Sequence, residues 1–148
     1  MADDQKVNRP YLQIALFCEK VLREQDGVLS LVRVIDRLFR SGLDREMQPF
    51  THQFFAVVTF KSGFMKGKMR IRLSPKSPTG EQLPELEFPV LFESDDRGAG
   101  VVVVLNFTFQ QEGLYWFDVY LEDELVTRMP MRVVYQQAGP GLPYAPPA

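Results

Sequence analysis

Cysteine and histidine are almost absent, since Cys18 and His52 are the single examples of each in 148 residues. One cysteine cannot form an intrachain disulfide, which excludes the disulfide frameworks of small secreted domains. A structural zinc site takes about four cysteine or histidine ligands, so the sequence predicts no metal centre. No glycine-rich phosphate loop is present either. We therefore expect no cofactor and no catalytic residues.

Long apolar runs and an excess of one charge are also missing. No uninterrupted apolar run is longer than that of Val101 to Leu105, whereas a membrane helix needs about 20 residues. The first ten residues, MADDQKVNRP, are polar and lack the apolar core of a signal peptide. Seventeen basic and nineteen acidic side chains give a formal net charge of -2. We expect a cytoplasmic protein that binds neither membranes nor nucleic acid.

Aromatic residues and strand patterns are abundant. The chain has twelve Phe and five Tyr, which favour strands and cores. The clearest pattern is a hairpin over residues 113–135, where Tyr115, Phe117, Val119 and Leu121 alternate with polar or amphipathic side chains. The length fits one domain. We predict a single β-sandwich domain over residues 11–136, between a flexible lead at 1–10 and a flexible proline-rich tail at 137–148.

Five further segments read as strands, with turn residues between them. They are residues 11–21, 51–61, 66–74, 86–93 and 101–109. Pro89 predicts an edge position for its strand, because proline cannot donate to a sheet ladder. The start of the Val101 segment is apolar on both faces, which predicts a central strand covered on both sides.

Residues 28–40 fit two structures. Their apolar residues match one face of a helix, and they also match the alternation of a strand, so the pattern leaves both open. The β-branched content and a preceding Asp26-Gly27 turn favour a strand for the first half. The fold prediction is an all-β, antiparallel β-sandwich of about eight strands, immunoglobulin-like or similar, with room for one short helix.

Two surface sets are candidate sites. Trp116, Asp118 and Tyr120 share the second face of the opening hairpin strand, and they are a partner-binding patch if exposed or core if covered. Lys68, Arg70 and Arg72 form a basic stripe that could hold an anionic ligand. The following segment, residues 81–96, is acidic, and cross-strand pairing with it is the favoured interpretation of the stripe.

Two other sets of residues have side chains of a type that could catalyse a reaction or bind a ligand. Cys18 and His52 could form a thiol dyad, but Cys18 falls on an apolar strand face, where cysteine usually packs as a small hydrophobe. The acidic turns at residues 95–96 and 122–124 could hold calcium, or a carbohydrate, if they lie at the same end of the sandwich. The favoured interpretation is that they make the sheet ends soluble.

The opening and closing segments together resemble a known group of proteins. In residues 15–38 the pattern consists of Cys18 with Glu19 and a later Asp36-Arg37-Leu38, and the closing pattern consists of Gly113, Tyr115, Phe117, Val119 and Pro130. This resembles a family of small, uncharacterised bacterial proteins of unknown function, over about residues 11–135. The resemblance implies a bacterial, cytosolic setting and strands in residues 28–39, and it implies no activity.

The functional hypothesis from the sequence is a non-enzymatic protein-interaction or assembly module. Its partner would be another protein or a second copy of the chain, because sandwiches expose edge strands and end loops that partners use. The alternatives are a small thiol enzyme using Cys18 and His52, and a carbohydrate- or calcium-binding sandwich domain.

Overall fold

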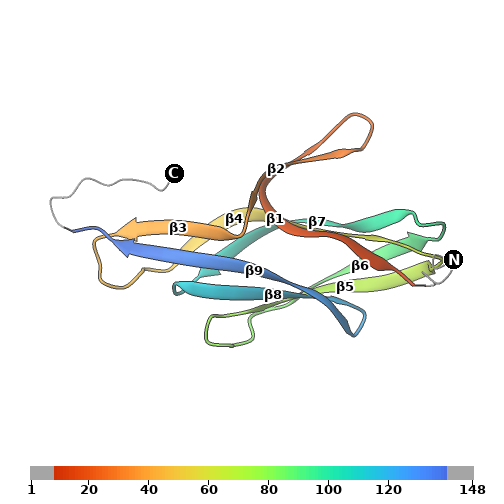
Figure 1. Cartoon of the computed structure of the whole chain (residues 1–148). Helices are drawn as coiled ribbons and strands as arrows, with labels where there is room; N and C mark the ends of the chain where they lie inside the picture. The colour runs from red at the N-terminus through yellow and green to blue at the C-terminus, as the bar shows by residue number, and fades with distance from the viewer. Residues whose placement is uncertain (1–8, 140–148) are drawn as a thin grey trace, which may run out of the picture.

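The computed structural model describes residues 9–139, which form nine β-strands and no helix (Figure 1). None of the described residues therefore belongs to a helix long and apolar enough to cross a membrane. The predicted lead and tail fall mostly outside this range. The strands are β1 (Tyr11–Arg23), β2 (Leu29–Ile35), β3 (Arg37–Gly42), β4 (Phe50–Lys61), β5 (Lys66–Lys76), β6 (Leu86–Glu93), β7 (Gly98–Phe109), β8 (Gly113–Leu121) and β9 (Glu124–Gln137).

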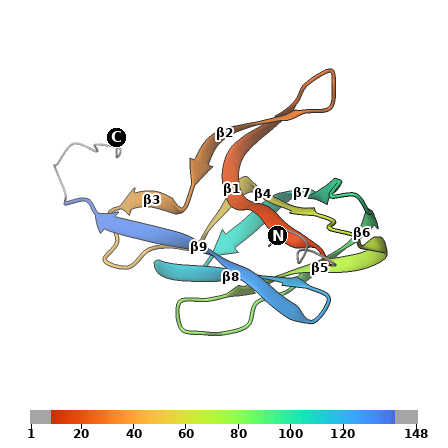
Figure 2. The same cartoon turned by 45° about the vertical axis from the view of Figure 1, so that its right-hand side comes forward.

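The strands form two sheets that pack against each other (Figures 1 and 2). The four-stranded sheet has the order β2-β1-β4-β7, and the five-stranded sheet has the order β3-β9-β8-β5-β6. The all-β, two-sheet prediction is confirmed in this form. The prediction of purely antiparallel pairing is wrong in one place, because β3 runs parallel to β9. The strands number nine in the described residues, against about eight predicted.

Residues 28–40 form two strands in different sheets, and the allowance for a helix was wrong. β2 pairs with β1, and the strand ends before a bend at Asp36. β3 then pairs with β9 in the other sheet. Ile35 and Leu38 are both buried in the shared core, one from each sheet. This change of sheet explains the three-residue spacing of apolar positions that resembled a helix.

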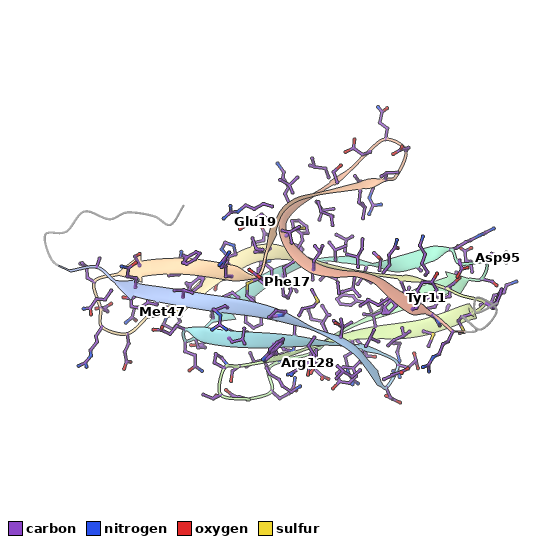
Figure 3. All side chains as sticks on the ribbon, in the orientation of Figure 1. Tyr11, Phe17, Glu19, Met47, Asp95 and Arg128 are labelled. Atoms are coloured by element: carbon purple, nitrogen blue, oxygen red, sulfur yellow. The ribbon has the colours of Figure 1, made fainter. Side chains whose placement is uncertain are left out.

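The core is aromatic and receives side chains from both sheets. Phe17 of β1 contacts Phe54 of β4 edge-on at 5.2 Å between ring centroids, and Phe117 of β8 at 4.9 Å. Figure 3 shows Phe17 between the two layers. Such edge-to-face pairs stabilise a core by about 0.5–1.5 kcal/mol beyond the area they bury.

The hairpin of β8 and β9 is confirmed, with Tyr115, Phe117, Val119 and Leu121 buried on one face. Its turn holds Glu122 at a φ of 55°. At the start of β8, Tyr115 donates a 2.8 Å hydrogen bond from its hydroxyl to the carbonyl oxygen of Gln111. This bond fixes the corner at which the chain enters the five-stranded sheet.

Two predictions about sheet position have opposite outcomes. Pro89 lies in β6, which is the last strand of its sheet, so the edge prediction is confirmed. The prediction of a central strand at Val101 is wrong, because β7 is also an edge strand. Its second apolar face does not lie under another layer of the described chain, and Val104 is 49% exposed.

The second half of β1 and β2 as far as Val34 leave the sandwich as a projecting hairpin. β1 pairs with β4 as far as Cys18, and beyond that point its pairing is with β2 alone. In Figures 1 and 2 this hairpin rises from the side of the four-stranded sheet that faces away from the five-stranded sheet. We call residues 19–34 the arm.

Candidate functional site

Trp116, Asp118 and Tyr120 lie together on the outer face of the five-stranded sheet, as predicted. Asp118 is only 5% exposed and accepts two charged hydrogen bonds, at 2.8 Å from Lys76 Nζ and at 2.7 Å from Arg128 Nε. Figure 3 shows Arg128 on this side of the molecule. Burial alone would raise the pKa of Asp118, but the hydrogen bonds from Arg128 and Lys76 outweigh burial and lower it.

The two aromatic rings beside Asp118 are covered by basic side chains. The guanidinium of Arg128 lies 4.5 Å from the Trp116 ring centroid, and that of Arg72 lies 4.3 Å from the Tyr120 ring centroid. These are cation–π contacts between neighbouring strands. The side chains that cover these rings therefore come from β5 and β9 and not from residues 28–40. Most of the tail lies outside the described residues. The predicted partner patch is a face whose charges are already paired.

The basic stripe of β5 is largely paired with acidic residues. Arg70 Nη1 lies 3.2 Å from Glu87 Oε1, and Arg72 Nε lies 3.7 Å from Glu85 Oε2. The cross-strand interpretation is thus confirmed for Arg70 and Arg72. Lys68 is exposed and has no ion pair within residues 9–139. An anionic-ligand role for the stripe stays a prediction with little geometric support.

The structure does not bring Cys18 and His52 together as a dyad. Cys18 lies opposite Phe55 and Val34 on the outer face of the four-stranded sheet, whereas His52 stacks on Phe54 of the inner face at 6.0 Å. The His52 Nε2 atom lies 3.5 Å from a carboxylate oxygen of Glu19, at the base of the arm. Burial raises the pKa of the Cys18 thiol, which favours the unreactive protonated form.

The acidic turns are engaged by separate partners. Tyr11 donates a hydrogen bond from its hydroxyl to Asp96 at 3.3 Å, and the backbone N–H of Arg70 donates one to Glu122 at 2.6 Å. Glu124 pairs with Arg9 at 3.4 Å. Among the described residues, no three His, Cys, Asp or Glu side chains are grouped so that they could hold a metal ion.

The outer face of the four-stranded sheet carries an apolar set of side chains that the sequence pattern did not reveal. Strand register places nine apolar side chains on it, and none of them belongs to the core cluster. We call this set the outer apolar face: Ile14, Leu16, Cys18, Val32, Val34, Phe55, Val57, Val102 and Val104.

Three residues of the outer apolar face are strongly exposed: Val32 at 42%, Val34 at 60% and Val104 at 49%. Lys20, which lies opposite Val32, is the charge at its margin on the arm. Exposed apolar side chains that gather on one side of a sheet can mark an interaction surface. The signal in the sequence was the double-sided apolarity of Val101 to Leu105, which we assigned to a covered strand.

A cavity of about 480 Å³ is the second feature that was missed. It lies between the two sheets where β7 faces the segment that connects β5 to β6, and Leu73, Leu105, Tyr115 and Phe117 line it from the core. Its volume is in the range of ligand pockets. The proline-rich stretch at residues 75–84, which lies between two of the predicted strand segments, supplies one wall.

Comparison with known proteins gives a family and no activity. A family of unknown function, DUF6941, matches residues 13–134. The chain belongs to the DUF6941 family. This agrees with the resemblance drawn from the opening and closing segments. A comparison with curated proteins gives no match.

Similarity to solved structures is remote. A β-glucosidase from Listeria innocua in complex with glucose is 16% identical, with a TM-score of 0.44 over 67% of this chain and 15% of that chain. The enzyme in complex with isofagomine is also 16% identical, with a TM-score of 0.44 over 84% of this chain and 16% of that chain. This chain thus spans a small part of those enzymes, and a likeness with a TM-score under 0.5 carries no argument about function.

Proposed function

We propose that this protein is a non-enzymatic assembly module that self-associates through its outer apolar face. The observation that carries the proposal is the exposure of Val104 on the four-stranded sheet and of Val32 and Val34 on the adjoining arm, all on the same side of their strands. Removing apolar surface from water contributes about 25 cal/mol per Å². A partner that covers this face therefore gains free energy from surface that the folded monomer leaves in water.

A second copy of the chain fits this face best. Since the centre of the face carries no charged side chain, its partner must also be apolar and uncharged there. A twofold dimer meets this condition automatically, because each copy presents the same patch to the other. Two sheet faces pack at a separation of about 10 Å when both are apolar, as the two sheets of a sandwich do.

The arm supports the same proposal. A two-stranded hairpin without a third strand is at best marginally stable in water. The arm exposes Leu22 at 43% and Val32 at 42% in addition to Val34. Packing of the arm against a second copy would cover these side chains and stabilise the hairpin.

The size of the face predicts reversible association. Without the arm, three strands about 4.8 Å apart and about five residues long, at about 3.4 Å per residue, give a flat area of about 240 Å². A standard stable interface buries about 800 Å² on each partner. We expect a dimer with a dissociation constant in the micromolar range.

Sedimentation velocity over about 1 to 200 µM protein tests the proposal. The wild-type protein should shift from monomer to dimer as concentration rises. Val34→Lys should stay monomeric, because the lysine ammonium would lose its water within the interface. Leu43→Lys is the matched control, since Leu43 is 72% exposed in the loop before β4 and should leave the equilibrium unchanged. A wild-type protein that stays monomeric at the highest concentration contradicts self-association.

An immunoglobulin-like classification is also part of the proposal. In that fold strands B and E are neighbours in one sheet and C, F and G in the other. The pairing of β4 with β7 and the run β5-β8-β9 match this arrangement, and the Tyr115 hydroxyl bond to Gln111 matches its tyrosine corner. An experimental structure with a different order of these strands would contradict it.

A bacterial, cytoplasmic setting completes the proposal. It is supported by the buried free thiol of Cys18, which needs no oxidising compartment. Fractionation of the native host, followed by detection of the protein outside the cytoplasmic fraction, would contradict it.

A further inference from the structure

The cavity between the two sheets lies against a free sheet edge. Five consecutive residues of β7, from Val104 to Thr108, line it, and β7 is the last strand of its sheet. An edge strand directs half of its backbone N–H and C=O groups away from its single neighbour. The cavity therefore combines apolar volume with a row of backbone groups that another strand can pair with.

The lining gives the occupant its chemistry. Leu73, Leu105 and Phe117 form an apolar interior, and Leu86, which is 39% exposed, stands at its mouth. Glu81 is the charged residue of the lining, and its carboxylate has no ion pair with the part of the chain that the structure describes. The lining favours an apolar occupant with a neutral or basic neighbouring group and disfavours an acidic one.

We propose that this groove binds an extended, acid-free peptide segment of a partner protein, which pairs with the edge of β7 and inserts apolar side chains into the cavity. Strand addition supplies main-chain hydrogen bonds, and the cavity selects the side chains. A segment of about five residues matches the lining length of β7, at about 3.4 Å per residue. The charge of Glu81 selects a lysine or arginine beside the inserted side chains.

The end of the chain itself is a poor occupant. Residues 140–148, PGLPYAPPA, contain four prolines in nine residues. Proline has no N–H to donate to an edge strand. A partner segment with ordinary residues at these positions pairs better.

The test uses the full-length protein and a displayed library of random peptides of about seven residues. Selected peptides should alternate apolar residues, carry Lys or Arg and lack Asp and Glu. One selected peptide is then synthesised with a fluorophore, and its affinity is measured by anisotropy. Leu86→Asp should weaken binding at least about tenfold, because it places a charge at the mouth of the cavity.

Two matched variants make the result specific. Leu91→Asp changes an exposed leucine of the same strand that does not line the cavity, so it should alter affinity by less than about twofold. Glu81→Lys should reverse the preference from basic to acidic peptides. Amide hydrogen exchange should show protection of residues 104–108 when the peptide is bound.

Several results would overturn the inference. These are a selection that enriches no peptide, a selected peptide that binds Leu86→Asp as tightly as the wild type, and binding without protection of the β7 amides. A cavity that takes up a neutral apolar dye such as N-phenyl-1-naphthylamine but no peptide is a small-molecule site, and this too contradicts the proposal. The test does not depend on self-association, because it can be run on the Val34→Lys variant.

Discussion

Arg128 donates a 2.7 Å hydrogen bond from Nε to Oδ1 of Asp118, directly across neighbouring strands of the five-stranded sheet. Lys76 donates a second bond to the other oxygen of the same carboxylate at 2.8 Å. The carboxylate is buried and the two cations are partly exposed, at 45% and 30% for their side chains. This arrangement turns the face predicted as a partner site into a structural ion-pair network, because it leaves no unpaired charge at its centre.

Asp118→Asn should lower the free energy of unfolding at neutral pH by about 1–3 kcal/mol, because it removes the charge that pairs Lys76 and Arg128. Urea unfolding followed by fluorescence measures the change. Since the pKa of Asp118 is lower in the folded protein than its ordinary value of 3.8, the contribution is present above that value and is lost as pH falls through the lowered pKa. The difference between the two proteins should therefore shrink in acid.

The control for Asp118 is Glu87→Gln. Glu87 pairs with Arg70 on the exposed surface, where both side chains are more than half accessible to water. Exposed pairs of this kind contribute about 0–1 kcal/mol. If Asp118→Asn and Glu87→Gln lower the free energy of unfolding equally, burial of the Asp118 carboxylate does not strengthen its ion pairs.

Tyr115→Phe should lower the free energy of unfolding by about 1–3 kcal/mol, because the hydroxyl donates one hydrogen bond to the backbone of Gln111 and accepts another from it, and one such bond usually contributes about 0.5–1.5 kcal/mol. The substitution keeps the buried ring and removes the hydroxyl that bonds Gln111 at 2.8 Å. Tyr120→Phe is the control, since its hydroxyl makes no hydrogen bond within residues 9–139 and its ring should still stack on Arg72. Equal stability of Tyr115→Phe and the wild type would show that the corner bond is replaced by water.

The strands of the sheets could be predicted from sequence more fully than the sites. The alternation at Tyr115, Phe117 and Val119 has a period of two whatever the sheet is packed on, so it was visible. The change of sheet at Asp36 was not, because it is decided by what Ile35 and Leu38 meet in the core. Periodicity places the side chains of Val102 and Val104 on the other side of the sheet from that of Val103. It cannot show whether another layer of the protein covers them. The cavity depends on how the edge strands β6 and β7 lie relative to each other, which no local sequence pattern specifies.

Cys18 should react with a thiol reagent only after unfolding. Its side chain is fully buried, and burial raises the pKa of its thiol above the ordinary value of 9.0. Time courses with dithiobisnitrobenzoate in buffer and in urea measure this. Rapid labelling of the native protein would contradict the burial and would reopen a chemical role for the thiol.

The same thiol predicts a dependence of stability on alkaline pH. Because the folded pKa of Cys18 is raised, its contribution is present below the ordinary value of 9.0 and is lost as pH rises through the folded pKa. Cys18→Ala has no such group. The stability of the wild type should therefore fall relative to Cys18→Ala as the pH rises above about 9.

Gly100→Ala should destabilise the protein by about 1–3 kcal/mol, because β7 runs too close to β4 at this position to admit a Cβ. An added Cβ would collide with the carbonyl oxygen of Val58 and would lie 2.6 Å from the Cα of Thr59. Both obstacles involve the backbone of the neighbouring strand, so rotation of a side chain cannot relieve them. Thermal unfolding of the two proteins measures the loss.

Gly98→Ala is the matched control for Gly100→Ala. Gly98 lies on the same strand, two residues earlier, and the nearest atoms to its added Cβ are 3.8 Å away, which is ordinary contact. Gly98→Ala should therefore lower the free energy of unfolding only slightly. A cost at Gly98 as large as at Gly100 would mean that glycine matters in β7 for chain flexibility and not for close approach. Loss of stability at Gly100 alone would establish that β4 and β7 hold the spacing on which both the outer apolar face and the groove depend.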